Sequence, residues 1–151
     1  MLTTCSNRSF KLALLLACCC LAGCGSAKKG QLSTAQVTGQ VTYRGAPLAR
    51  GTIKFIPVQA SGKETRVAHG VLDEQGRYCL GTYVPDDGAL LGDYQVVVES
   101  RAEPPDVAHA TKLDLMRPKS LIPARYANPG TSRLTAHVEA GGNTVNFDLK
   151  D

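Results

Sequence analysis

The sequence has no tryptophan, and aromatic residues make up only 5% of its 151 positions. It also lacks helical periodicity, which argues against a helical bundle. Its net charge is only +4, and the basic residues are scattered rather than gathered in a stripe. Nucleic-acid binding therefore has no support, because it needs a dense basic surface. Sugar-binding surfaces often use exposed aromatic rings, and the only loop candidates are Tyr83 and Tyr126, of which we expect Tyr126 to fill the core.

Cysteine is almost missing from most of the chain. Of six cysteines, four lie within "LALLLACCCLAGCG" at residues 12–25, and only Cys5 and Cys79 lie elsewhere. A disulfide framework needs cysteines spread through the folded chain. A zinc site usually needs two separated pairs of ligands. The spacing fits neither, and Cys79 is expected to be a free thiol.

The start of the chain is typical of an export signal. Residues 1–11 carry Arg8 and Lys11 and no acid, and the apolar run at 12–22 is shorter than the roughly 20 residues of a membrane-spanning helix. The sequence Leu21-Ala22-Gly23-Cys24 then resembles the bacterial lipobox. The resemblance implies a signal peptide at 1–23, removed on export, and a lipid attached to Cys24. It also implies a membrane-anchored protein of the cell envelope, and Gly25 at the next position favours the outer membrane.

The mature chain has a short tether and one domain. Residues 24–35 are small and polar and predict a flexible tether, with a reach on the order of 20 Å. Lys28 and Lys29 would lie beside the lipid and near an anionic surface. Residues 36–151 have the length of a single domain with a core that is stable without disulfides.

The domain has the period-two alternation of β-strands. Seven segments show it, and helix signals are nearly absent: 37–43, 52–58, 66–72, 77–83, 93–100, 134–140 and 143–149. We expect the last two to form a hairpin through Gly141 and Gly142. The pattern predicts an all-β fold, a seven-stranded antiparallel β-sandwich.

One long segment, 101–133, interrupts this rhythm with five prolines. A short helix is expected at 106–116, after an Asp cap. Long loops on a rigid sandwich often carry function, but such a segment can also be a packed crossover that covers a sheet edge. Both interpretations are kept. If the segment binds a glycan or small molecule, Arg125, Tyr126 and Asn128 are the candidate residues.

Several stretches together resemble a known family. They are "VTGQVTYRGAPLARGTIKFIPV", "DEQGRYCL", "PDDGALLGDYQVVV" and "SLIPARYANPGTSRLTAHVEAGGNTVNFDL", which span residues 37–149. They look like small bacterial lipoproteins with a carboxypeptidase regulatory-like, transthyretin-like domain. The resemblance implies a prealbumin-type sandwich with no assigned reaction or cofactor. We therefore expect a non-enzymatic structural or protein-binding module, with envelope proteins or glycans as partners.

A hydrolase is the second alternative. Some transthyretin-like relatives are hydrolases recognised by a Tyr-Arg-Gly-Ser end, but this chain ends "NFDLKD". Its "YRGA" at 43–46 is better explained by a turn. The spacing of His69, His109 and His137 along the chain suggests no Ser–His–Asp or Cys–His pair, so no catalytic residue is predicted.

A metal site has little support in the sequence. Asp86, Asp87 and Asp93 cluster near two glycines, and carboxylates are ligands that calcium prefers. Their spacing is not that of an EF-hand, so we predict no metal site.

Overall fold

Strands make up almost all of the regular structure in the computed structural model, which describes residues 31–58, 66–102 and 119–151. The strands are β1 (Thr34–Ala35), β2 (Val37–Tyr43), β3 (Ala46–Pro47), β4 (Thr52–Pro57), β5 (Ala68–Val71), β6 (Arg77–Cys79), β7 (Ala89–Leu90), β8 (Gly92–Glu99), β9 (Leu134–Val138), β10 (Asn143–Thr144) and β11 (Phe147–Leu149). The helical elements are η1 (Ala124–Ala127) and α2 (Pro129–Ser132). The all-β prediction is confirmed.

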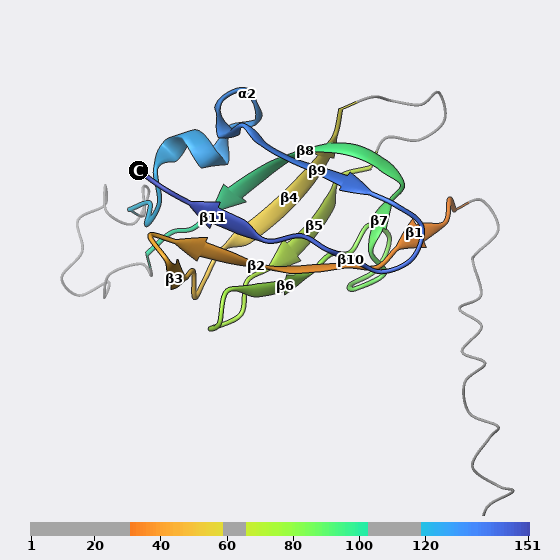
Figure 1. The fold of residues 1–151 in the computed structure, drawn as a ribbon, viewed down its shortest axis with the longest axis horizontal. Helices are drawn as coiled ribbons and strands as arrows, with labels where there is room; N and C mark the ends of the chain where they lie inside the picture. The colour runs from red at the N-terminus through yellow and green to blue at the C-terminus, as the bar shows by residue number, and fades with distance from the viewer. Residues whose placement is uncertain (1–30, 59–65, 103–118) are drawn as a thin grey trace, which may run out of the picture. The chain divides into compact units, whose positions relative to one another are not determined.

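The strands form two main sheets, which Figure 1 shows as two layers. In one sheet β2 lies between β10–β11 on one side and β3 and β6 on the other. The other has the order β5-β4-β8-β9, and β1 pairs separately with β7. His69 and Gly81 exchange backbone hydrogen bonds of 3.0 and 2.9 Å, which joins the chain after β6 to β5. The described chain is therefore a β-sandwich-like fold with its two sheets linked along one edge.

The core lies between these sheets and comes from the expected alternation. Phe55 is fully buried, and its ring centroid lies 5.7 to 6.3 Å from those of Tyr78, Tyr94 and Phe147. These four rings come from strands of both sheets, and each large apolar side chain buried in this way stabilises the fold by about 1.5–3 kcal/mol. The other large, fully buried side chains of the strands are Val37, Val41, Ile53, Val96, Val98, Val138 and Leu149.

The predicted final hairpin is wrong. β9 pairs antiparallel with β8, whereas β10 and β11 pair with β2, and they do so in parallel. The chain crosses from one sheet to the other at 139–142. Asn143 supports this turn because its side chain accepts from the N–H of Glu139 at 3.0 Å and donates to its carbonyl at 2.9 Å. The expectation of a purely antiparallel sandwich is wrong for the same reason. Three short strands that were not expected, β1, β3 and β7, are also present.

The predicted tether ends too late. Its last residues, Thr34 and Ala35, form β1, where Ala35 pairs with Ala89 and is only 4% exposed. The folded unit comprises Leu32–Asp151. The signal peptide, Cys24, most of the tether, His109 and the expected helix at 106–116 lie outside the described residues. Within the described ranges, no helix is long and apolar enough to cross a membrane.

Candidate binding groove on strand β2

A local break in the ladder between β2 and β10–β11 creates the most distinctive feature of the sheet. The register places Val145 opposite Gly39, and the Val145 N–H donates normally to the Thr38 carbonyl at 2.9 Å. In a regular parallel ladder the Gln40 N–H would then donate to the Val145 carbonyl. Instead, Gln40 N–H donates to the side-chain oxygen of Asn146 at 2.8 Å. The two backbones are thus joined here through a side chain.

The freed carbonyl of Val145 has a different partner. The hydroxyl of Tyr78, which lies on the other side of β2, donates to it at 2.7 Å. Burial raises the pKa of Tyr78 well above its ordinary value, so the hydroxyl stays protonated and remains a donor. Tyr78 therefore fastens β6 to β10–β11 across the intervening strand.

Gly39 makes this crossing possible. A Cβ atom at this position would lie 1.8 Å from the Val145 carbonyl oxygen and 2.9 Å from the Tyr78 hydroxyl. Both separations are shorter than real Cβ contacts, so the neighbouring atoms would have to move. A glycine inside a strand is a signal for such a close approach, and it is the sequence feature that could have pointed here.

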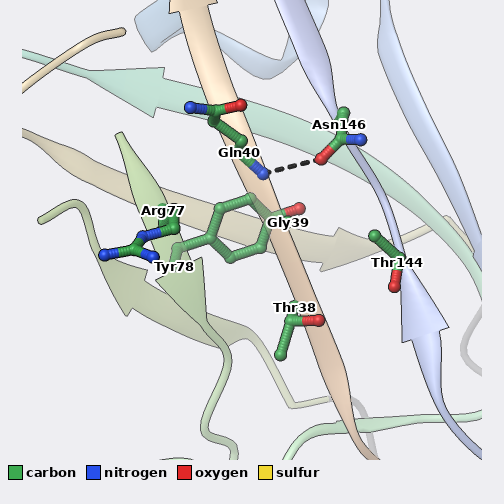
Figure 2. A pocket seen from close by; sticks show the side chains of 7 residues that line it. All are labelled: Thr38, Gly39, Gln40, Arg77, Tyr78, Thr144 and Asn146. Atoms are coloured by element: carbon green, nitrogen blue, oxygen red, sulfur yellow. Dashed lines mark hydrogen bonds between the residues drawn. The ribbon is translucent and has the colours of Figure 1, made fainter. Parts of the chain in front are cut away.

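An open groove of about 400 Å³ lies over this break, as Figure 2 shows. Strands β2, β6 and β10 and the link before β11 supply its wall, which consists of Thr38, Gly39, Gln40, Arg77, Tyr78, Thr144 and Asn146. The polar members Thr38, Gln40, Thr144 and Asn146 were not predicted as site residues, because outward polar residues of an alternating strand look like an ordinary solvent face.

The polar atoms of the groove divide into occupied and available groups. Arg77 donates to Asp73 and Gln75 at 3.0 Å each, so much of its guanidinium is held by the neighbouring turn. Among the described residues, no hydrogen bond reaches the hydroxyls of Thr38 and Thr144. The groove thus offers two free hydroxyls to a polar ligand.

The predicted binding residues all make hydrogen bonds within the fold. The Tyr126 side chain is only 6% exposed, and its hydroxyl accepts from the Lys150 N–H and donates to the Lys150 carbonyl, both at 2.9 Å. Arg125 donates to the same carbonyl at 2.7 Å and lies over the Tyr126 ring. Asn128 caps α2 by accepting from the N–H of Gly130 at 2.9 Å. The expectation that Tyr126 fills the core is confirmed.

The described part of the 101–133 segment behaves as a packed crossover. Arg101 and Ser120 form an isolated bridge, and Ile122 and Tyr126 are buried in the core. α2 packs on β8, where the Ser132 hydroxyl donates to the Val96 carbonyl at 2.6 Å. The described residues 119–132 thus cover part of the sandwich beside β8.

The two described histidines lie far apart in the fold. His69 is exposed on β5 and His137 is exposed on β9, which are the opposite edges of one sheet. His137 Nδ1 lies 2.6 Å from the Asp93 carboxylate, and this hydrogen bond raises the pKa of His137. In its protonated form His137 therefore makes a surface ion pair with Asp93.

The acidic residues considered for calcium do not converge. The Asp87 carboxylate accepts from the backbone N–H groups of Thr82, Tyr83 and Val84 at 2.6 to 3.2 Å, which orders the loop. Asp93 is paired with His137, as described above. The acids thus have separate local roles.

Cys79 is a free, partly buried thiol. Burial, and then the neighbouring charge of Asp86, raise the pKa of this thiol. It is therefore mostly protonated and a poor nucleophile at neutral pH.

Comparisons with known proteins add little beyond the fold. No known family model matches the sequence, and no curated protein is significantly similar to it. A DUF3823 family protein from Parabacteroides merdae has a similar structure, with 13% identity over 79% of this chain and 47% of that one, and a TM-score of 0.37. A 9R-lipoxygenase from Cyanothece is 14% identical over 83% of this chain and 18% of that one, with a TM-score of 0.35. The chain thus spans less than half of either protein, and the likeness concerns the β-rich fold alone.

Proposed function

We propose that this protein is a lipid-anchored, non-catalytic module of the bacterial cell envelope, with a regulatory-like β-sandwich as its binding domain. The observation that carries the proposal is the order of parts along the chain. The lipobox-like Leu21-Ala22-Gly23-Cys24 is followed after a few residues by Leu32, where the folded unit begins. A lipid on Cys24 would hold the domain close to the outer membrane, where it would bind envelope proteins or glycans.

The chemistry of the described residues supports a binding module rather than a hydrolase. His69 and His137 lie on opposite edges of a sheet, and the Cys79 thiol is held in its protonated form. The side chains of Arg125 and Tyr126 are engaged in holding the C-terminal strand. Within the described ranges these groups thus lie in separate places, which supports the proposal of a non-catalytic module.

The anchor is tested by intact mass. Wild type and Cys24→Ser are recovered from membrane fractions of an expressing didermal bacterium. We expect the wild type to start at Cys24 with a diacyl or triacyl addition, and the variant to be unmodified and released. An unmodified, soluble wild-type chain would overturn the lipid anchor and the proposed location.

A second candidate function is glycan binding in the groove on β2. Its specific support is the pair of free hydroxyls, Thr38 and Thr144, beside the amide of Asn146. Such groups can exchange hydrogen bonds with sugar hydroxyls, and an open groove suits an extended ligand. The groove is thus proposed as a glycan site in addition to the expected candidates Arg125, Tyr126 and Asn128.

A thermal-shift screen against a glycan panel tests this candidate. A ligand at 100 times its Kd would stabilise the protein by about 2.7 kcal/mol. We expect the shift to disappear in Thr38→Val/Thr144→Val, which removes the hydroxyls and keeps the shape. The control is Thr135→Val on the other sheet, which should retain the shift. No response to any glycan, or equal responses in both variants, would exclude the groove.

A further inference from the structure

The exposed apolar side chains of the described domain are concentrated at one end of the sandwich. Seven large hydrophobic residues are at least 42% exposed, and five of them form what we call the tether-end patch: Leu32, Val58, Val67, Val84 and Leu91. The other two, Val71 and Leu121, lie at the opposite end of the four-stranded sheet. There, Val71 on β5 pairs with Thr52 on β4, and the Leu121 N–H donates a hydrogen bond to the Ser100 carbonyl.

Contacts between distant segments bring the tether-end patch together. The Leu32 N–H donates to the Tyr83 hydroxyl at 3.2 Å, and the Arg66 guanidinium lies 5.0 Å from the centre of the Tyr83 ring. Val67 and Val84 are the chain neighbours of Arg66 and Tyr83. Val58 and Leu91 flank the start of β8, because the Val58 N–H donates to the Asp93 carbonyl at 3.0 Å. Figure 1 shows β1 and β7 at this same end.

We propose that the tether-end patch docks on the lipid bilayer that holds the anchor. This inference rests on the proposed lipidation of Cys24. Only eight residue steps separate Cys24 from Leu32, which allows at most about 29 Å of extended chain and a coil reach of about 16 Å. The eight residues of β8 alone span roughly 27 Å. Because the coil reach is shorter than β8, a lipid on Cys24 favours an orientation with the patch end nearest the membrane, and an apolar surface there gains from being buried in the interface.

The charges at this end show which force would act. Arg66 is cationic, but Asp86, Asp93 and Glu139 belong to the same end of the domain. Anionic lipids would therefore attract the domain itself only weakly. The docking would rest on apolar burial, so it should occur equally on zwitterionic and anionic membranes and should resist salt.

The absence of tryptophan offers a clean probe, because a single introduced Trp reports its own surroundings. The full lipidated protein carries either Val84→Trp in the patch or Val71→Trp at the opposite end, and Leu91→Trp is a second patch variant. Each is placed in phosphatidylcholine vesicles with or without brominated acyl chains, which quench nearby Trp. Parallel samples contain phosphatidylglycerol or high salt.

We expect a blue shift and a loss of fluorescence to bromine for the two patch variants, in all lipid mixtures, and neither effect for Val71→Trp. Equal quenching at both ends, or none in protein that is lipidated and floats with the vesicles, would overturn the docking and leave the anchor intact. A blue shift without quenching would mean that another copy covers the patch. Quenching that requires phosphatidylglycerol would overturn the apolar mechanism. Protein that lacks the lipid by mass and does not float would overturn both proposals.

Discussion

Replacing Gly39 by alanine tests the break in the β2 ladder. The new methyl group would lie 1.8 Å from the Val145 carbonyl oxygen, so β2 and the β10–β11 chain must separate. Forcing a methyl group into occupied space costs about 1–3 kcal/mol, and loss of the Tyr78 hydrogen bond costs about 0.5–1.5 kcal/mol. Alanine offsets about 0.5–1 kcal/mol through the lower entropy of the unfolded chain. The net loss of unfolding free energy is about 2 kcal/mol.

Urea unfolding followed by far-UV circular dichroism measures this loss. We would use the Cys24→Ser background, which keeps the lipid out of the measurement. With a slope near 2 kcal/mol per molar urea, the midpoint should fall by about 1 M. Gly142→Ala is the matched control because nothing lies within 4 Å of its added Cβ, and its midpoint should hardly move.

A second variant identifies the cause. Tyr78→Phe leaves the Val145 carbonyl without its donor and should cost about 1–3 kcal/mol. Combined with Gly39→Ala, its effect should be less than additive, because both changes remove the same hydrogen bond. A Gly39→Ala midpoint equal to that of Gly142→Ala would refute the crossing of Tyr78 over β2.

Two further predictions concern other polar contacts. The hydrogen bond to Asp93 raises the pKa of His137 above its ordinary value of 6.5. The pair therefore stabilises the folded state fully below about pH 6.5, and this stabilisation is lost as the pH rises through the folded-state pKa of His137. Urea midpoints from acidic to alkaline pH should show that decline, and Asp93→Asn should remove it; an unchanged decline in the variant would contradict the pairing. Tyr126→Phe should lower the unfolding free energy by about 1–3 kcal/mol, because it leaves the Lys150 N–H without its acceptor, whereas the Lys150 carbonyl keeps its hydrogen bond from Arg125. Tyr43→Phe, at an exposed hydroxyl, is the control, and equal effects in both would refute a special role for Tyr126.

The strands themselves could be predicted well from the sequence. Residues such as Ile53 and Phe55 alternate with polar neighbours, and the period-two pattern directly states which face meets the core. The separate expectation that the aromatic ring of Tyr126 fills the core is also confirmed. The candidate groove could not be predicted in this way, because Thr38, Thr144 and Asn146 have the polarity of any solvent-facing strand position.

The sequence by itself determined the all-β class and the inward and outward faces of each long strand, because these depend on residue type and local spacing. Only the tertiary structure decided that β10 and β11 run parallel to β2, that Arg125 and Asn128 support the fold, and that five exposed apolar residues share one end. The physical reason is that alternation states which side of a strand is buried but not which strand pairs with it. Contacts such as Tyr78 with Val145 join residues 67 positions apart, and their specificity arises only once both sheets are in place.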